Sequence, residues 1–598
     1  MIRRHKLPFG AEYFGDGLTR FSVWAPAAGS MELVLDTGAR PMECDGDGVF
    51  TLTADAEPGV RYRYRMGGGQ EVPDPASRYQ PEDVHGPSAV IDPGAFDWQD
   101  EGWKGRPWHE TVLYELHVGA FSPEGTFAGV ESGLDLLSDL GVTAIELMPL
   151  ADFPGGRNWG YDGVLPFAPD GTYGIPEDLK RLIQAAHERR IQVFLDVVYN
   201  HFGPEGNYLP NYAPDFFTER HETPWGAAIN FDGADSQHVR EFFIHNALYW
   251  LEEYHVDGLR LDAVHAIVDE SDEHFLSELA RRIRRGPGGD RYIHLVLENE
   301  ENQSSRLQGD GLYSAQWNDD VHHALHTALT GEDAAYYADY ADTPVGHLGR
   351  CLAEGFAYQG ERSGHRGNGR GEPSADLPPT SFIAFLQNHD QVGNRAFGDR
   401  ITDLARPEAV RAAAAIYLLS PQVPMLFMGE EWAASSPFLF FCDFEEGLAP
   451  LVTEGRRSEF AKFPEFAEEA TRERIPDPSS AETFQASKLD WTERDKLEHA
   501  GWLSFYRELL SIRHKKIVPC LDGITGGLAR YRMVGKRGLE TRWTLGDGSR
   551  LTLHANLGNT PLGGFEKPEG EPLYTTDGAE ASDDLPAWSV AWFLREAG

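Results

Sequence analysis

Residues 256–265 carry an arginine and an aspartate at the spacing of a β-strand, in the run VDGLRLDAVH. In an extended strand, side chains two residues apart point to the same face, so Arg260 and Asp262 share one face and Leu259 and Leu261 share the other. A nearby guanidinium favours the ionised form of a carboxyl group. Asp262 is therefore expected to be a carboxylate at neutral pH, which is the state that a nucleophile requires.

Two further acids end apolar runs of the same kind. Glu298 follows residues 292–297, and Asp390 closes residues 382–390. A single acid of this sort more often belongs to a structural ion pair, but three acids at three strand ends suggest glycosyl chemistry. A retaining glycosidase needs two carboxyl groups about 5 Å apart, one to attack the anomeric carbon and one to protonate the leaving oxygen. Glu300 and Glu301 are neighbouring candidates for the second group; Glu298 is preferred because it follows the strand directly.

The acids are positioned by strands that alternate with helices from about residue 111 onward. Residues 112–117, 144–148, 193–198 and 423–428 are candidate strands. Residues 237–254 repeat apolar side chains at helical spacing, which predicts a helix between two of the strands. Strands that end in functional acids are typical of a (β/α)8 TIM barrel, whose site lies at the carboxyl ends of the strands.

The chain is too long for one hydrophobic core, so several domains are expected. Short alternating runs in residues 1–105 predict an immunoglobulin-like β-sandwich. Residues 106–520 are assigned to the barrel, with a loop-rich insertion at about 201–234, and residues 521–598 to an antiparallel β domain. The predicted fold class is multidomain α/β: a central TIM barrel with an N-terminal β-sandwich and a C-terminal β domain.

A formal net charge of −42 excludes a nucleic-acid partner and makes an anionic membrane an unfavourable neighbour. The basic start is not followed by an apolar run of signal-peptide length, and no window of about 18 apolar residues exists. Cys44, Cys351, Cys442 and Cys520 show no pairing or metal-type spacing. We therefore expect a soluble, cytoplasmic protein.

No metal and no cofactor is expected. The oxygen-bearing side chains that could hold calcium in such a barrel are those of Asn200, Asp232, Asp319 and Asp320. They lie far apart in the sequence and form no recognisable ligand motif. The chemistry is therefore assigned to carboxyl groups alone.

Four motifs, in the expected order, resemble those of the alpha-amylase superfamily of glycoside hydrolases. They are Asp196-Val197-Val198-Tyr199-Asn200-His201, Gly258-Leu259-Arg260-Leu261-Asp262, the region around Glu298, and Asn388-His389-Asp390. The resemblance implies that Asp262 is the nucleophile, Glu298 the general acid/base and Asp390 the acid that stabilises the transition state. It also implies that Asp196 holds the local network and Arg260 together.

Side chains that bind sugar are expected around these acids. His201 and His389 each follow an asparagine at a strand end, where a neutral imidazole can hydrogen-bond a sugar hydroxyl. Tryptophan and tyrosine in predicted loops on the catalytic side would stack on pyranose rings; Tyr161 is favoured because the superfamily places an aromatic there. The full set of predicted substrate-binding residues is Tyr161, Asp196, His201, Trp225, Arg260, His265, Trp317, Asn388 and His389.

Motifs outside the catalytic core resemble one family within that superfamily, the malto-oligosyltrehalose trehalohydrolases. They are residues 115–121, 158–163, 223–230, 315–323, 428–434 and 454–460. The run Asn299-Glu300-Glu301-Asn302-Gln303 departs from the more regular acidic and asparagine pattern expected after Glu298. The resemblance implies hydrolysis of the α-1,4 bond next to the terminal trehalose of maltooligosyl trehalose, after a synthase has made that end.

Two other functions remain open at this point. A 1,4-α-glucan branching enzyme would share the layout and the first chemical step, but such enzymes commonly carry a glutamate where His389-Asp390 is followed here by Gln391. A non-catalytic glucan-binding protein would be favoured by loss of a catalytic acid. Asp262, Glu298 and Asp390 are all present.

Overall fold

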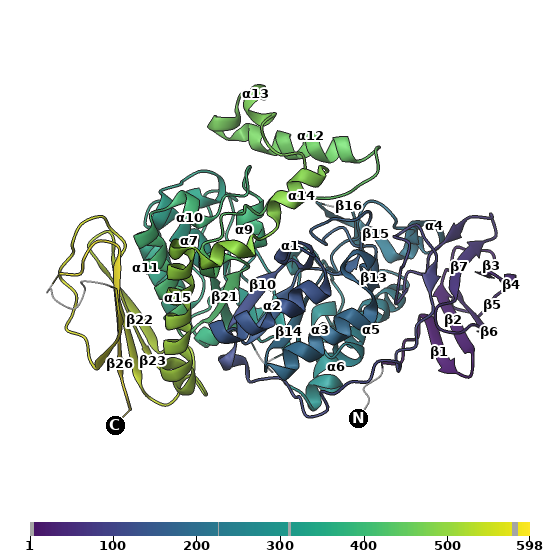
Figure 1. The fold of residues 1–598 in the computed structure, drawn as a ribbon, viewed down its shortest axis with the longest axis horizontal. Coiled ribbons are helices and arrows are strands. Elements are labelled where there is room, and N and C mark those ends of the chain that lie inside the picture. The colour runs from purple at the N-terminus through teal and green to yellow at the C-terminus, as the bar shows by residue number, and fades with distance from the viewer. Residues whose placement is uncertain (1–4, 225, 309–311, 577–583, 598) are drawn as a thin grey trace.

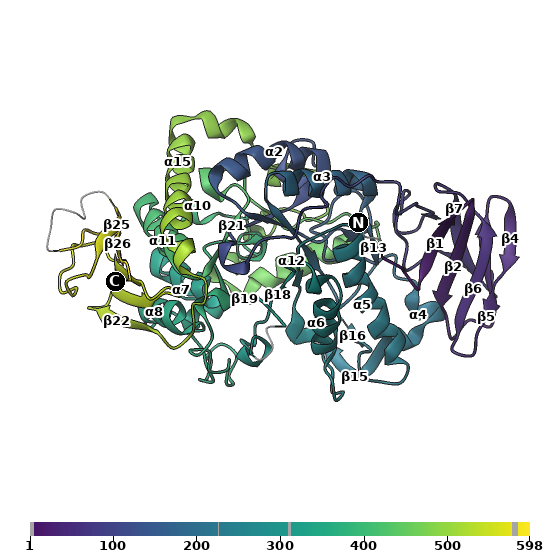
Figure 2. The same cartoon turned by 90° about the horizontal axis from the view of Figure 1, so that it is seen from below.

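The computed structural model describes residues 5–224, 226–308, 312–576 and 584–597. A barrel occupies the middle of an elongated molecule, with one β structure at each end (Figure 1). The view from below shows the same order, with the amino-terminal and carboxyl-terminal sheets on opposite sides of the barrel (Figure 2). The predicted fold class is confirmed. Among the described residues, no helix combines the length and the apolar character that a membrane span needs.

Eight parallel strands close the central barrel, and the first pairs with the last, so that Leu113 lies opposite Met425. Main-chain pairing therefore leaves no free edge. The strands, in spatial order, are β10 (Leu113–Leu116), β11 (Ala144–Leu147), β14 (Gln192–Val197), β17 (Gly258–Leu261), β18 (His294–Leu297), β19 (Ala315–Trp317), β20 (Phe382–Phe385) and β21 (Val423–Phe427).

Helices cover the outside of the barrel. Thr126 caps α2 by accepting from the Gly129 N–H, and Gly141 ends it in the left-handed conformation at φ 103°. The larger helices are α2 (Phe127–Leu140), α3 (Pro176–Glu188), α5 (Ser236–Glu253), α6 (Phe275–Arg285), α7 (Asp319–Thr330), α8 (Pro344–Glu354), α11 (Pro407–Leu419) and α15 (Leu497–Ile512).

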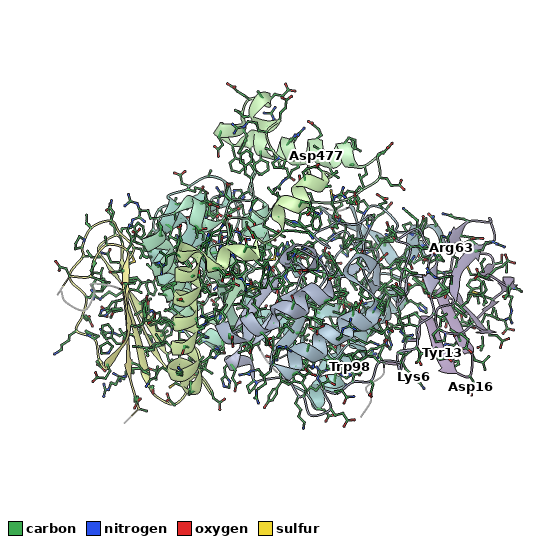
Figure 3. All side chains as sticks on the ribbon, viewed as in Figure 1. Lys6, Tyr13, Asp16, Arg63, Trp98 and Asp477 are labelled. Atoms are coloured by element: carbon green, nitrogen blue, oxygen red, sulfur yellow. The ribbon has the colours of Figure 1, made fainter. Side chains whose placement is uncertain are left out.

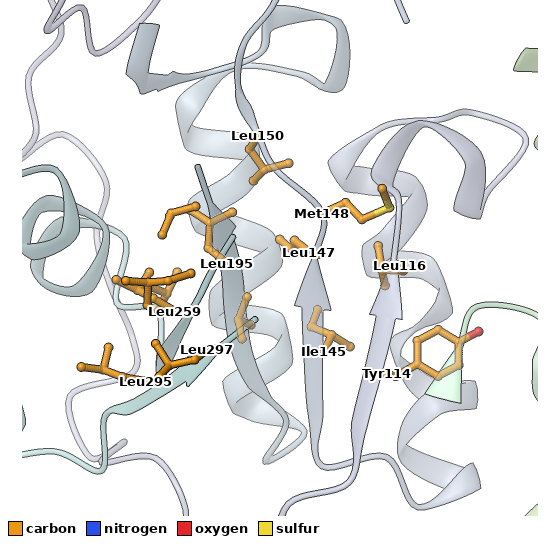
Figure 4. Close-up of a cluster of buried hydrophobic side chains, with 14 of the residues drawn as sticks. Tyr114, Leu116, Ile145, Leu147, Met148, Leu150, Leu195, Leu259, Leu295 and Leu297 are labelled. Atoms are coloured by element: carbon orange, nitrogen blue, oxygen red, sulfur yellow. The ribbon is translucent and has the colours of Figure 1, made fainter. Parts of the chain in front are cut away.

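Alternate strand residues build two different cores. Outward-facing side chains such as Ile145, Leu195 and Leu259 pack under the helices (Figure 4). Inward-facing side chains form a separate apolar cluster within the barrel, consisting of Leu113, Ala144, Phe194, Val296, Ala315, Trp317, Ile383, Phe385, Val423 and Met425. Gly258 makes this interior possible, because a Cβ there would lie 2.3 Å from the Phe194 ring.

The barrel interior changes from apolar to charged along its axis. Two residues beyond the apolar layer, toward the carboxyl ends of the strands, stand Glu115, Glu146, Asp196 and Arg260. All four are buried, at 0–3% exposure. Charges that are buried away from solvent must be compensated by neighbouring charges of opposite sign. This compensation determines the chemistry described below.

The N-terminal domain is a pair of antiparallel sheets that packs on the side of the barrel. Trp24 stacks on His238 of α5 with ring centroids 4.8 Å apart, and Trp98, after the last sandwich strand, stacks on His255 at 3.9 Å (Figure 3). The first sheet runs β1 (Gly10–Gly15), β2 (Leu18–Trp24), β6 (Val49–Asp55), β5 (Glu43–Cys44), and the second β4 (Gly38–Pro41), β3 (Met31–Leu35), β7 (Arg61–Met66), β8 (Glu71–Val72), with β9 (Ser88–Ala89) beside β7.

The C-terminal sheet packs on the opposite side, against α8 and α11. Trp543 donates to the Leu352 carbonyl at 2.9 Å, and Trp592 donates to the Ala415 carbonyl at 3.1 Å. The two indoles also stack on each other at 5.6 Å. The strand order is β22 (Ala529–Val534), β23 (Gly538–Thr544), β24 (Arg550–Asn556), β26 (Ser589–Arg595), β25 (Glu571–Thr575).

Smaller elements surround the carboxyl ends of the barrel strands. The segment that leaves β14 contains α4 (Leu209–Tyr212) and the hairpin of β15 (Phe217–Thr223) and β16 (Gly226–Ile229). Another segment stands above the barrel in Figure 1 and contains α12 (Ala449–Glu459), α13 (Glu469–Arg472) and α14 (Ala481–Ser487). It includes Asp477, which accepts from the Thr453 hydroxyl at 2.7 Å (Figure 3).

Candidate active site

The site is organised by Arg260, whose side chain is fully buried at the charged end of the barrel. Its Nη1 donates to Asp196 Oδ2 at 2.7 Å and to Asp262 Oδ1 at 2.8 Å, and its Nη2 lies 3.0 Å from Glu298 Oε2. The indole of Trp317 covers the guanidinium, with 4.2 Å from Cζ to the ring centroid. One cation thus joins the ends of three consecutive strands.

Asp262 directly follows β17 and is fixed through both carboxylate oxygens. Asn200 Nδ2 donates to Asp262 Oδ2 and also to its carbonyl oxygen, each at 2.8 Å, while Oδ1 accepts from Arg260. Burial alone would raise the pKa of Asp262, but Arg260, His201 and Asn200 outweigh it and lower the pKa below its ordinary value. The carboxylate is therefore ionised and directed by two partners, as the sequence predicts.

Glu298 directly follows β18 and has the opposite electrostatic environment. Burial, together with the charges of Asp262, Asp390 and Asp319, raises its pKa well above the ordinary value, and Arg260 only partly opposes this. Oε2 accepts the Ala263 N–H at 2.7 Å. Ala263 has φ 39°, a left-handed conformation that a non-glycine residue adopts only under constraint. Glu298 is thus a protonated acid held beside an ionised one, the contrast that separates acid from nucleophile.

Asp390 does not close a strand, so that prediction is wrong. β20 ends at Phe385, and Asp390 lies in the first turn of the short helix α9 (His389–Gly393). Asn388 caps this helix by accepting the Gln391 N–H at 2.8 Å. The apolar run continues only to Leu386, and the cap turns the chain before a longer strand can form. Asp390 is the most exposed of the three acids, with 38% of its side chain accessible.

Helix α9 is held by groups from outside the barrel strands. Arg395, just past its end, forms a two-pronged ion pair with Glu332, both distances being 3.0 Å. Arg456 of α12 donates to the Gly393 carbonyl at 2.7 Å. A small apolar cluster of Ala396, Phe460 and Ile475 joins the same two segments. The position of Asp390 therefore depends on the segment above the barrel.

His389 carries a charge, which corrects the expectation of a neutral imidazole. Its Nδ1 donates to Glu115 Oε1, and its backbone N–H donates to Glu115 Oε2 at 3.0 Å. Burial opposes protonation, but Asp390 and Glu115 raise the pKa of His389 to about 9. Asp390 is the next residue in the sequence, whereas Glu115 lies on the first strand of the barrel and its contribution has no local signature. The imidazolium adds a second cation to the site.

Tyr161 and His201 lie on the side of Asp196. The Tyr161 hydroxyl donates to Asp196 Oδ2 at 2.7 Å, and its ring stacks on His389 with centroids 5.1 Å apart. Burial raises the pKa of Asp196 to about 6 against the pull of Arg260. Burial lowers the pKa of His201, which is therefore neutral as expected, and its Nε2 lies 2.9 Å from the Tyr161 carbonyl.

Several predicted sugar contacts occupy other places. Trp317 is the last residue of β19 rather than a loop residue, and at 1% exposure it supports Arg260 instead of facing solvent. His265 lies in the 3₁₀ turn after Asp262, where burial lowers its pKa. Asn388 acts as the cap of α9. Trp225 lies outside the described residues.

Two buried acids were not anticipated. Glu115 pairs with His389, and Glu146, its neighbour in the barrel register, has no hydrogen-bond partner for either carboxyl oxygen among the described residues. Burial, together with Glu115 and Asp196, raises the pKa of Glu146 well above its ordinary value. A single acid at an inward position of an otherwise apolar strand is the signal that could have revealed both.

A cavity of about 370 Å³ opens on the Glu298 side of the site. Glu298 and Asp390 line it, whereas Asp262 does not. Other lining residues come from α7 and the loops near it, and include Asp319, His323, Tyr336 and Arg366. Glu298 and Asp262 therefore do not both face this space.

The oxygen groups considered for calcium already have protein partners. Asn200 binds Asp262, and Asp319 accepts from Gln391 Nε2 at 3.2 Å. Asp320 forms an ion pair with Arg370 at 2.8 Å, and Asp232 lies 3.1 Å from Arg220 and 2.9 Å from His221. Among the described residues, two groups have metal-like spacing, His85 with Glu205 and Glu445, and His221 with Asp232 and Glu270. Neither includes a catalytic candidate.

Comparison with known sequences decides the family. A family model for the alpha amylase catalytic domain matches residues 77–224, a carbohydrate-binding module 48 (isoamylase N-terminal domain) matches residues 8–82, and a domain of unknown function matches residues 526–592. A malto-oligosyltrehalose trehalohydrolase of Saccharolobus solfataricus is 43% identical over 86% of this chain and 88% of its own length. Another, of Deinococcus radiodurans, is 42% identical over 91% of this chain and 90% of its own.

The chain belongs to the malto-oligosyltrehalose trehalohydrolase family. A crystal structure from Salmonella typhimurium, described as an alpha amylase, matches with a TM-score of 0.94 and 46% identity, covering 98% of this chain and all of the other. Trehalohydrolase relatives therefore match all three parts of the molecule and not the barrel alone.

The charge of His389 gives a prediction for the pH dependence of stability. Its folded pKa of about 9 lies above the ordinary value of about 6.5, so its interactions with Asp390 and Glu115 stabilise the folded state fully below about pH 6.5. The contribution is lost as the pH rises through 9. We expect the difference in thermal unfolding midpoint between wild type and His389→Gln to shrink between pH 6.5 and 9.5. A difference that grows with pH would contradict a charged His389.

Proposed function

We propose that this protein hydrolyses the α-1,4-glucosidic bond next to the terminal trehalose of maltooligosyl trehalose, releasing trehalose and a maltooligosaccharide. The observation that carries the proposal is the pair Asp262 and Glu298, which share one guanidinium yet have opposite pKa shifts. The names of the relatives support the substrate. Retention of configuration is general for this family and requires one ionised and one protonated carboxyl group.

In the first step, Asp262 attacks the anomeric carbon of the glucosyl unit while Glu298 gives its proton to the glycosidic oxygen. The bond to the trehalosyl oxygen breaks, and a glycosyl ester with Asp262 forms. Arg260 and Asn200 hold the Asp262 carboxylate in place before the attack. Because both partners are already in position, little reorganisation is needed at the moment of reaction.

In the second step, Glu298, now a carboxylate, removes a proton from water, and the water oxygen displaces Asp262 from the anomeric carbon. We assign Asp390, which lines the cavity together with Glu298, to stabilisation of the transition state. Tyr161 is assigned to stacking under the cleaved sugar, and His201 to hydrogen bonding of a hydroxyl. Asp196 supports Arg260 and Tyr161.

The substrate requires another enzyme, because a trehalosyl end does not arise by hydrolysis of starch or glycogen. We propose that a maltooligosyl trehalose synthase supplies it. We also propose a cytoplasmic location. Cys351 and Cys442 are buried free thiols, which suits a reducing compartment.

The reaction is tested by its products. Purified protein is incubated with maltotriosyl trehalose and, separately, with maltopentaose, and the products are separated by chromatography. We expect trehalose and maltotriose from the first substrate, with kcat/KM at least about tenfold above that for the second. New α-1,6 linkages from longer amylose would instead indicate a branching enzyme, and binding without turnover would indicate a non-catalytic protein.

Asp262→Asn should lower kcat by at least about 1,000-fold, because the amide cannot form the glycosyl ester. Folding should be kept, since Asn can still accept from Arg260 Nη1. Binding of maltotriosyl trehalose, measured by calorimetry, should remain. Activity near that of wild type would remove Asp262 from the role of nucleophile.

Glu298→Gln should slow the hydrolysis of maltotriosyl trehalose by about 100-fold or more, because the leaving oxygen of this substrate needs a proton. A maltotriosyl fluoride, whose leaving group needs no proton, should form the glycosyl ester at a nearly unchanged rate in a single turnover. Glu300→Gln, which changes an acid two residues away that binds Arg366, is the comparison variant and should lose less activity than Glu298→Gln. If Glu300→Gln gives the selective loss and Glu298→Gln does not, the acid is misassigned.

A further inference from the structure

Residues 360–372 form a loop that borders the cavity beside Glu298. This loop contacts the segment that follows Glu298. Arg366 of this loop lies 2.8 Å from Glu301 Oε1 through Nη1 and also donates to Glu300 through Nη2. Arg370 donates to the Glu300 carbonyl through Nε at 3.0 Å. The two loops therefore form one wall, and Glu300 and Glu301 hold an arginine rather than serving as alternative proton donors.

Arg366 differs from the other groups of this cavity in charge and in available hydrogen bonds. The wall contains carboxyl groups from Glu298, Asp319 and Asp390. Arg370 is also present, but its side chain is only 8% exposed and is occupied by Asp320, Tyr340 and the Glu300 carbonyl. The Arg366 side chain is 23% exposed, and its hydrogen bonds to Glu300 and Glu301 use two of its five N–H donors.

The base of the loop is also fixed, so that the guanidinium is presented from a defined position. Asp339 accepts the His365 N–H at 2.9 Å, and the Arg366 N–H donates to Ser363 Oγ at 3.0 Å. An arginine whose fork is already oriented by two carboxylates loses less rotational freedom when it binds a ligand. This is the arrangement of a binding group and not of a solvated surface charge.

Discrimination between leaving groups needs such fixed donors. Trehalose and maltose have the same composition and nearly the same size, so the volume of a cavity cannot separate them. They differ in the direction of the second ring and in the positions of its hydroxyl groups. A site built to hydrogen-bond particular hydroxyls rejects an analogue that leaves its polar groups unpaired.

We propose that Arg366, oriented by Glu300 and Glu301, is a specificity-determining residue that donates hydrogen bonds to hydroxyl groups of the departing disaccharide. This inference rests on the proposed function, since it concerns the trehalose end of the same substrate. The two acids and the arginine are expected to act as one unit.

The experiment compares substrates with and without a sugar leaving group. Arg366→Gln should lower kcat/KM for maltotriosyl trehalose by about 10- to 100-fold, the range for loss of hydrogen bonds to a charged group. For maltotriosyl fluoride, whose leaving group is a single atom, kcat/KM should stay within about twofold. Maltopentaose hydrolysis should fall less than trehalose release, so the ratio between the two substrates should shrink.

Arg362→Gln is the matched control, because it removes the same charge from an exposed position of the same loop. This variant should keep kcat/KM for all three substrates within about twofold of the wild-type values. Arg366→Lys keeps the charge and loses the planar fork, so it should show the pattern of Arg366→Gln to a smaller degree. This variant also serves if Arg366→Gln fails to fold, which thermal unfolding would reveal.

Four results would overturn the inference: an equal loss on maltotriosyl trehalose and on the fluoride, no loss on either, the same loss for Arg362→Gln, or an equal loss on maltotriosyl trehalose and on maltopentaose. The last result would mean that Arg366 acts through the position of Glu298, because both of these substrates need a proton on the leaving oxygen and the fluoride does not. Failure of the proposed function would look different, because wild-type protein would then release no trehalose from maltotriosyl trehalose.

Discussion

The structure depends on one buried cation. Arg260 has no exposure to water, so its charge is tolerated only because three carboxyl groups surround it. Those groups come from the ends of β14, β17 and β18, three neighbours in the barrel. The same contacts that compensate the guanidinium also bring the nucleophile and the acid together. Assembly of the strands and assembly of the site are therefore one event, and removal of a carboxyl partner leaves an unbalanced charge in the interior.

The protonation states follow from the same balance. The charged layer contains more acids than cations, with Arg260 and His389 facing Glu115, Glu146, Asp196, Asp262, Glu298 and Asp390. So many carboxylates cannot all ionise in one enclosed volume. Arg260 lowers the pKa of Asp262, whereas burial and neighbouring carboxyl groups raise the pKa of Glu146 and of Glu298 well above their ordinary values. Glu298 stays protonated although Arg260 lies 3.0 Å away, because burial and the charges of Asp262, Asp390 and Asp319 outweigh that contact. Its protonation is therefore a consequence of the whole layer rather than of Glu298 alone.

Much of this arrangement could be predicted from the sequence, because it depends on local regularities. Period-two alternation located β17 and β18, and an acid directly after each strand identified Asp262 and Glu298. The failures share a different cause. Asp390 lies on a helix whose cap overrides the apolar pattern, and part of the charge of His389 comes from Glu115, 274 residues away in the chain. Trp317 was misplaced because nothing in the sequence shows that it covers Arg260. Contacts between segments remote in sequence have no local signature, and the contacts of Arg366 with Glu300 and Glu301 are of this kind.

The pairing of β10 with β21 has a consequence for how the protein is made. The first barrel strand can pair with the last only late in synthesis, because Met425, the partner of Leu113, is made after all the intervening strands. Throughout that interval the growing chain exposes an unpaired strand edge, together with the inner apolar face that the closed barrel conceals. Arg456 follows later still. The nascent polypeptide is therefore inactive during most of its translation. The position of β21 in the sequence sets how long the chain needs protection from aggregation.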